Sequence, residues 1–233
     1  MKRFYTDVST AREGDGAGLS IRLDARPVRT PARALLVVPA ADLAEAIVAE
    51  WQAQGDKIDP RTMPMTGLAN AAIDRVAPDP ARFIATLAPY AETDLLCYRA
   101  EDPPELVAQE AAAWDPLLAW ARARYDVAFE LASGIVHRPQ PEATIRRLTT
   151  ALAGRDPFAL AAMSPLVTIG GSLVTALALA EGRIDADAAF DATHLDEIWQ
   201  AEQWGEDYLA TEARDLRRAD FVAAARFLRL IAA

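Results

Sequence analysis

The run LVTIGGSLVTALALA, residues 166–180, decides the fold because it is the most apolar stretch of the chain. Gly170 and Gly171 interrupt it, and it is shorter than the about 20 apolar residues that a membrane-spanning helix needs. The run therefore predicts a buried helix at the centre of a helical domain. Within that helix, the two glycines indicate close packing against a neighbour rather than a phosphate-binding loop.

Helical patterns lie on both sides of this run. The 7% aromatic content and the many alanines also favour tightly packed helices, because alanine is the best helix former. Proline inside a helix removes a hydrogen bond, so we expect Pro116 to kink or restart the helix that contains it. The predicted helices cover residues 81–88, a segment starting near Pro104, residues 142–152 and 157–162, and a long helix or helix pair from about Ala186.

The first forty residues have a different pattern, which is typical of strands. Phe4, Thr6 and Val8 alternate with polar or charged neighbours, and residues 19–23 alternate in the same way. We expect turns at residues 13–16 and 24–27 and a further short strand at residues 35–38. These segments predict a small antiparallel sheet with one buried face.

Two helices should follow this sheet. In residues 41–54, Leu43, Ile47 and Trp51 recur at helical spacing and form one apolar stripe that can cover the sheet. A second helix should run from Thr66, as its cap, to Val76. We therefore predict an α+β protein, with a β-containing N-terminal domain at residues 1–78 and a helical C-terminal domain at residues 79–233, divided near Pro78-Asp79-Pro80.

Composition limits the kinds of partner and compartment. The formal net charge is −10, so the chain should be repelled by nucleic acid and by anionic membrane surfaces and suits a basic partner. Cys97 is the single cysteine, which rules out an intramolecular disulfide and favours a reducing compartment. The N-terminus resembles neither a signal peptide nor an organelle presequence. We expect no nucleic-acid binding and no stable membrane insertion.

A search for catalytic motifs finds none. The two histidines, His137 and His194, lack the spacing of metal ligands, and Cys97 lies in an apolar context typical of a buried, inert thiol. No Walker A loop, GxSxG elbow or GxGxxG motif occurs. We therefore predict no catalytic residue, cofactor or metal. The alternative is a small-molecule enzyme that uses a pair of carboxylates in an interdomain cleft, because acidic residues are abundant.

The segment LDEIWQAEQWGEDY, residues 195–208, indicates a contact surface. Read as one helix, it has two apolar sides, each with carboxylates. Aromatic anchors supply buried area in protein interfaces, and carboxylates select arginine or lysine. Local basic residues are scarce, so we expect a basic partner to neutralise the acids. The alternative is that one tryptophan packs in the core and the acids are hydrated. The first side carries Leu195, Ile198, Trp199, Glu202 and Glu206; the other carries Glu197, Ala201, Trp204 and Tyr208.

The sequence as a whole resembles the assembly chaperones of the α subunit of the F-type ATP synthase, of the mitochondrial and alphaproteobacterial type. Short matches occur in order along nearly the entire chain. They are LDARPVRTP at residues 23–31, EWQAQ at 50–54, MPMT at 63–66, DLLCYR at 94–99, WDPLLAW at 114–120, and the C-terminal signature with Leu195-Asp196-Glu197, Gln200, Glu202 and Trp204-Gly205.

This resemblance implies a two-domain chaperone that binds the free α subunit and prevents its aggregation before it meets the β subunits. It implies partner-binding roles for Asp196, Glu197 and Glu202, alongside Trp204. It implies the same role for Trp51, although that residue also lies on the apolar stripe of its own helix. Eukaryotic members have a histidine where this chain reads Ala210-Thr211-Glu212, so no histidine role carries over.

The same resemblance places a bacterial member in the cytoplasm and its eukaryotic relatives in mitochondria. We expect the free protein to be a monomer. A third possibility is a permanent structural subunit of a larger complex, which should expose a large apolar patch and aggregate or co-purify when isolated.

Overall fold

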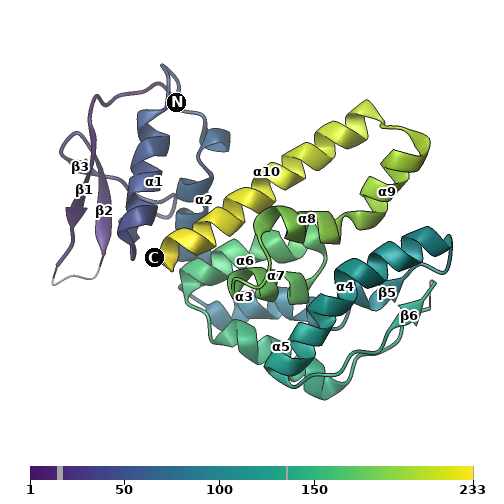
Figure 1. Cartoon of the computed structure of the whole chain (residues 1–233). Helices are drawn as coiled ribbons and strands as arrows, with labels where there is room; N and C mark the ends of the chain where they lie inside the picture. The colour runs from purple at the N-terminus through teal and green to yellow at the C-terminus, as the bar shows by residue number, and fades with distance from the viewer. Residues whose placement is uncertain (15–17, 135, 233) are drawn as a thin grey trace. The chain divides into compact units, whose positions relative to one another are not determined.

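The computed structural model describes residues 1–14, 18–134 and 136–232. The chain forms two compact units, whose elements are labelled in chain order in Figure 1. Unit 1 comprises Met1–Pro80, Asp156–Ala162 and Arg226–Ala233, and unit 2 comprises Ala81–Arg155 and Met163–Ala225. The division at residues 78 and 79 stays a prediction. In the described part of the chain, no helix is both long and apolar enough to cross a membrane.

Unit 1 contains a small antiparallel sheet, which confirms the predicted fold class. Strand β2 pairs with each of the other three strands, and Val8 of β1 lies opposite Leu23 of β2. Helix α1 (Ala41–Gln52) contacts β1, β2 and β4, and its Leu43 and Ile47 are fully buried. The strands are β1 (Val8–Arg12), β2 (Leu19–Leu23), β3 (Arg26–Pro27) and β4 (Val37–Val38).

The predicted strand over residues 3–8 is wrong, since β1 begins only at Val8. The expected burial also fails at residues 4–6, because Tyr5 is buried and Phe4 and Thr6 are exposed, whereas Val8 is buried as predicted. The cause is a distant partner: the Tyr5 hydroxyl donates to the Trp51 carbonyl oxygen, at 2.7 Å, at the C-terminal end of α1. Carbonyls in the last turn of a helix lack helical partners, so they attract such donors. The turn expected at residues 13–16 lies partly outside the described residues.

The loop after α1 contains a short 3-10 turn, η1 (Pro60–Thr62), and leads into α2 (Pro64–Ala71) and a π-helical turn, η2 (Ala72–Val76). The predicted helix is therefore present, but it begins at Pro64 and Thr66 is not its cap. Glu50 supplies the cap instead. Its carboxylate accepts from the Met65 and Thr66 backbone N–H groups at 2.6 and 2.8 Å, and from the Thr66 hydroxyl at 2.7 Å.

The remaining elements are mainly helices. A parallel pair of two-residue strands, β5 and β6, also occurs in unit 2, so the expectation of helices alone is corrected there. The elements are α3 (Pro80–Leu87), η3 (Ala88–Ala91), η4 (Leu95–Cys97), β5 (Tyr98–Arg99), α4 (Pro104–Tyr125), β6 (Ala132–Ser133), α5 (Glu142–Ala153), α6 (Pro157–Gly170), α7 (Leu173–Ala180), α8 (Ala186–Thr193), α9 (Leu195–Trp204) and α10 (Tyr208–Ile231).

The apolar run 166–180 is buried as predicted, but it is not a single helix. Helix α6 continues through Pro165 to Gly170, and α7 starts after the left-handed Gly171, whose φ is +65°. The Ser172 hydroxyl accepts from the Thr175 N–H at 3.0 Å and so caps α7. A Cβ at Gly170 would lie 3.2 Å from the Thr193 methyl group, which confirms close packing at that glycine.

Asp94 fixes the N-terminus of α7 from a distant part of unit 2. It is fully buried and accepts from the Val174 and Leu96 N–H groups at 2.8 and 3.1 Å. Burial raises the pKa of Asp94 to about 6, although these backbone donors stabilise its charged form. The DLLC segment that begins at Asp94 therefore has a structural role in joining this loop to α7.

Helix α4 continues without a restart through Pro116. Burial on both sides of the proline offsets the lost hydrogen bond, because Trp114, Leu117 and Leu118 are all in the core. The Trp114 indole N–H donates to the Ala192 carbonyl oxygen at 2.7 Å, which joins α4 to α8. This junction positions the C-terminal helices that carry the predicted site.

Candidate protein-binding site

The predicted contact segment forms helix α9 in unit 2 and ends at Trp204. Gly205 follows with a φ of +90°, so the single helix expected over residues 195–208 is in fact α9, a short turn and the start of α10. Glycine reaches this backbone conformation without the steric cost that other residues carry. The turn is why Trp204 and Tyr208 belong to two different helices.

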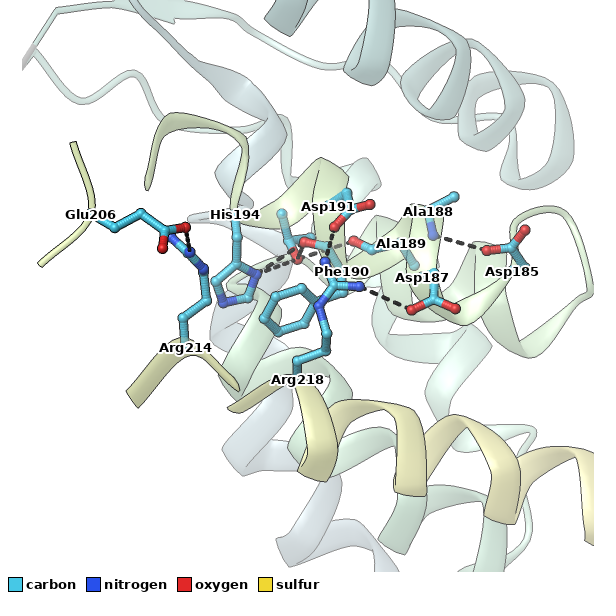
Figure 2. A network of polar contacts seen from close by, with 11 residues as sticks. Asp185, Asp187, Ala188, Ala189, Phe190, Asp191, His194, Glu206, Arg214 and Arg218 are labelled. Atoms are coloured by element: carbon cyan, nitrogen blue, oxygen red, sulfur yellow. Dashed lines mark hydrogen bonds and ion pairs between the residues drawn. The ribbon is translucent and has the colours of Figure 1, made fainter. Parts of the chain in front are cut away.

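His194 links α8 to the first residue of α9. Its ring stacks on Phe190, with centroids 3.8 Å apart, and its Nδ1 lies 3.0 Å from the Phe190 carbonyl oxygen (Figure 2). Burial is the main reason why the pKa of His194 lies below its ordinary value, so the ring is neutral near pH 7. His194 is therefore a packing residue.

Arg218 holds α10 against α8. Its guanidinium lies 4.6 Å from the centre of the Phe190 ring and donates to the carboxylates of Asp187, at 2.9 Å, and Asp191 (Figure 2). Arg214, one helical turn earlier, is 3.5 Å from Glu206. These contacts give α8, α9 and α10 a defined arrangement within unit 2.

A cleft of about 710 Å³ opens among these helices and α4; we call it the α9 cleft. One side of α9 lines it with Leu195, Ile198, Trp199 and Glu202, which are four of the five residues that helical spacing places on one face. The fifth, Glu206, lies in the turn after α9 and is not in the lining. Ala113 of α4 and Ala188 of α8 are also in the lining. Further lining residues with charged side chains are Asp191, Arg214, Asp215 and Arg218.

The acids of α9 have three different environments. Glu197 pairs at 2.5 Å with Arg217, which lies on α10, so for this acid a neighbouring helix supplies the basic group that we expected from a partner. Asp196 is half-buried beside Glu110 of α4. Glu202 is exposed and, in the described part of the chain, has neither a hydrogen-bond nor an ion-pair partner. Glu202 is therefore the α9 carboxylate most available to another molecule.

The neighbouring carboxyl groups of Glu110 and Asp196 form a buried pair. Glu110 is 1% exposed and accepts from the Ala100 N–H at 2.9 Å, while Asp196 Oδ1 is buried without a hydrogen-bond partner. Burial raises the pKa of Glu110 to about 7, with a further contribution from Asp196, and burial also raises the pKa of Asp196. Neither residue lines the α9 cleft, so the pair acts inside unit 2, where α9 packs on α4.

Large apolar side chains are exposed where α9 meets α10. The Trp204 ring packs edge-on against Trp199, with centroids 5.7 Å apart, while Trp204 itself remains 75% exposed. Asp215 and Leu216 of α10 line a smaller hollow of about 340 Å³ together with Tyr208. The exposed members of this surface are Trp204, Tyr208, Leu209 and Leu216.

Trp51, the fifth predicted site residue, belongs to unit 1. Its ring meets Tyr5 edge-on at 5.7 Å, it is partly exposed, and its indole nitrogen is buried without a hydrogen-bond partner. The preceding Glu50 caps α2, and burial raises its pKa. This packing agrees with the reading of Trp51 as a residue of the apolar stripe, and its role in partner binding stays a prediction.

Sequence reasoning missed several members of the site. Arg217, Arg218, Asp215, Leu209 and Leu216 all lie on α10, whose apolar residues occur on two faces. The buried stripe of α10 consists of Phe221, Ala224, Phe227 and Leu228. Leu209 and Leu216 are seven residues apart and lie outside that stripe, so helical spacing could have predicted them as a second apolar stripe. Glu110 had no local signal, because its carboxylate neighbour comes from a distant helix.

The described residues offer little for catalysis. Cys97 is buried, and burial raises its pKa to about 12, so the thiol is inert as predicted. In residues 1–14, 18–134 and 136–232, no group of three or more His, Cys, Asp and Glu side chains is arranged to hold a metal ion. What the site offers is exposed aromatic surface, a cleft and uncompensated carboxylates, which define a protein that binds other proteins.

Comparison with known proteins identifies the kind of binder. The family model described as ATP12 chaperone protein matches residues 2–122, and the chain belongs to this chaperone family. Over 231 residues it is 25% identical to the protein atp12, mitochondrial, of Schizosaccharomyces pombe, covering 93% of this chain and 79% of that protein. The family resemblance and the expectation of a chaperone are thereby confirmed.

Solved structures agree with this assignment. The crystal structure of Atp12 from Paracoccus denitrificans is similar with a TM-score of 0.93 and 40% identity, covering 99% of this chain and 98% of that one. The Atu1473 protein of Agrobacterium tumefaciens is similar with a TM-score of 0.93 and 42% identity, covering 99% and 86%. The relatives therefore include a mitochondrial protein of a eukaryote and proteins of bacteria.

Proposed function

We propose that this chaperone binds the free α subunit of the F-type ATP synthase and keeps it from aggregating until it assembles with β subunits. The observation that carries the proposal is the exposed surface where α9 meets α10. It combines Trp204 and its apolar neighbours with Glu202, which has no partner in the described part of the chain. A subunit awaiting assembly exposes apolar surface that must be covered, and this site offers a matching cover.

We also propose that the protein acts without catalysing a reaction. Among the described residues, the neighbouring carboxyl groups that an enzyme using a carboxylate pair would need are best represented by Glu110 and Asp196, and neither of them lines the α9 cleft. A general acid must reach its substrate within hydrogen-bond distance, which the burial of Glu110 opposes. We further propose that the protein acts in the bacterial cytoplasm and is a monomer when free, as expected for a transient cover.

Light scattering tests the proposal. Purified α subunit of a bacterial F-type ATP synthase is warmed until it aggregates, with and without an equimolar amount of this chain. We expect the chain to suppress scattering and Glu202→Lys to weaken that suppression, because the lysine repels the basic side chains that we expect on the client. Arg26→Glu, which reverses an exposed charge on β3, is the control. Equal aggregation with and without the wild-type chain would overturn the proposal.

A further inference from the structure

The α9 cleft is built to receive apolar side chains. Ala113 of α4 and Ala188 of α8 contribute only methyl groups to its lining. Across from them stand the larger side chains of Leu195, Ile198 and Trp199 on α9. A volume of about 710 Å³ is in the roughly 300–1,000 Å³ range of pockets that bury a whole ligand, so several side chains fit inside.

The charges around the cleft are unequally satisfied. Asp191 is bound by Arg218, and Arg214 faces Glu206 at 3.5 Å (Figure 2). Glu202 and Asp215 are both exposed and, among the described residues, make no hydrogen bond or ion pair through their carboxylates. Two uncompensated acids therefore face the same opening, which favours a cationic group at its edge.

The apolar lining continues onto the outside of unit 2. Trp199 lines the cleft and touches Trp204, which is exposed beside the entrance. Asp215 lines both the cleft and the smaller hollow that Tyr208 and Leu216 also line. An occupant that enters the cleft can therefore extend across this outer surface, which suits a polypeptide better than a compact small molecule.

We propose that the α9 cleft binds an amphipathic helix of the client, with apolar side chains at i and i+4 inside the cleft and a lysine or arginine facing Glu202 and Asp215. The inference rests on the proposed chaperone function and names the kind of segment that this site recognises. Apart from Ile184, which precedes α8, the lining residues lie on helices, so the cleft offers grooves for helix side chains and its lining has no strand edge for backbone pairing. A fatty acid would bring its carboxylate against the two unpaired acids, which disfavours a lipid.

The first test fills the cleft. Ala188 is an exposed alanine that lines it, so Ala188→Leu should occupy the space with little effect on folding. Ala119→Leu makes the same change at an exposed position of α4 that is outside the lining. For the purified α subunit, we expect Ala188→Leu to raise the Kd at least tenfold and Ala119→Leu to leave it within twofold. An unchanged Kd for a folded Ala188→Leu variant overturns the inference while the chaperone proposal stands.

The second test uses a probe that is independent of the α subunit. A synthetic helical peptide with leucines at i, i+4 and i+7 and flanking lysines is compared with the same peptide carrying glutamates. We expect the wild-type chain to bind the lysine peptide at least tenfold more tightly, and the double variant Glu202→Gln, Asp215→Asn to lose that preference. Both substitutions are at exposed positions, so the variant keeps its fold. Equal binding of the two peptides contradicts the inference, whereas lysine-peptide binding without α-subunit binding contradicts only the proposed function.

Discussion

Two groups of acids in unit 2 differ in where their charge is neutralised. Glu181, just after α7, accepts from Arg124 Nε at 2.6 Å, from the Tyr125 hydroxyl at 2.7 Å and from Arg155 at 2.9 Å. Burial raises its pKa, but these donors outweigh burial and the net pKa is lowered. Glu202 and Asp215, in contrast, have no such donors in the described part of the chain.

The difference separates acids that serve the fold from acids that are available to a partner. Two donors to Glu181, Arg124 and Tyr125, lie in the last turn of α4, and the third, Arg155, follows α5. Glu181 therefore joins the C-terminal ends of α4, α5 and α7, where arginine side chains also interact favourably with the helix dipoles. Glu202 and Asp215 of the α9 cleft join no other element in the described part of the chain, and they lie beside exposed aromatic surface. Neutralisation inside the chain is thus a practical criterion for choosing which acids to mutate.

The largest effect should come from the aromatic anchor next to the unpaired acids. Trp204→Ala removes a ring that is 75% exposed, so the free energy of unfolding should change by less than about 0.5 kcal/mol. Interface tryptophans are frequent hot spots, and we expect binding of the α subunit to weaken by about 2–3 kcal/mol, roughly a hundredfold. Titration calorimetry with the purified α subunit measures this. If the variant binds the α subunit as tightly as wild type, Trp204 is not part of the contact surface.

The opposite pattern is expected at Glu181. Glu181→Ala leaves Arg124, Tyr125 and Arg155 without their shared acceptor, so the variant should lose about 2 kcal/mol of unfolding free energy. Urea denaturation followed by circular dichroism measures the loss, and α-subunit affinity should stay within twofold of wild type. A variant that keeps its stability but loses binding would show that Glu181 is a partner-binding acid. The distinction between acids that stabilise the fold and acids that bind a partner would then be wrong.

The third prediction concerns how the free energy of unfolding depends on pH through Glu110 and Asp196. Because the folded-state pKa of Glu110 is raised to about 7, the folded chain binds more protons than the unfolded chain, and its stability should fall as pH rises from 5 to 8. Glu110→Gln keeps an acceptor for the Ala100 N–H and removes the carboxyl group that titrates. We expect the variant to lose less stability over this range, by about 1–2 kcal/mol.

Denaturation curves at several pH values, recorded for both proteins, give this difference directly. Glu105→Gln, which alters an exposed acid in the first turn of α4, is a suitable control. Parallel pH profiles for wild type and Glu110→Gln would show that the buried pair does not take up a proton on folding.

The smallest expected effect is the neutral substitution of an unpaired acid. Glu202→Gln removes one charge without a change in size, so stability should stay within about 0.5 kcal/mol. Its binding to the α subunit should weaken by about 1 kcal/mol, roughly fivefold, and the loss should shrink at high salt because screening weakens the charge–charge attraction. Binding kinetics with the α subunit immobilised on a surface, recorded at two ionic strengths, measure this loss of affinity. A loss that is independent of salt would indicate changed shape complementarity instead of a lost charge–charge attraction.

Local patterns predicted much of the fold. The alternation in residues 19–23, the stripe of Leu43 and Ile47, and the apolar run 166–180 depend on neighbours in sequence, and the structure confirms their burial. The failures involve distant partners. The burial of Tyr5 depends on the end of α1, and the start of α2 depends on Glu50.

The site shows the same division. Of the five residues that helical spacing placed on one face, Leu195, Ile198, Trp199 and Glu202 line the α9 cleft. Glu206 does not, because α9 ends at Trp204. The pairing of Glu197 with Arg217 could not be predicted, because it depends on how α10 returns past α9 after the turn at Gly205. Tertiary contacts therefore decide which acids of the signature remain available.

Hydrogen exchange of the chain, alone and in complex with the α subunit, tests the central claim most directly. We expect binding to slow the exchange of backbone amides in residues 195–216, which carry the cleft and the exposed aromatic surface, and to leave residues 146–155 near the Glu181 cluster unchanged. Protection at residues 146–155 without protection at residues 195–216 would contradict the assignment of the α9 and α10 surface as the chaperone's binding site.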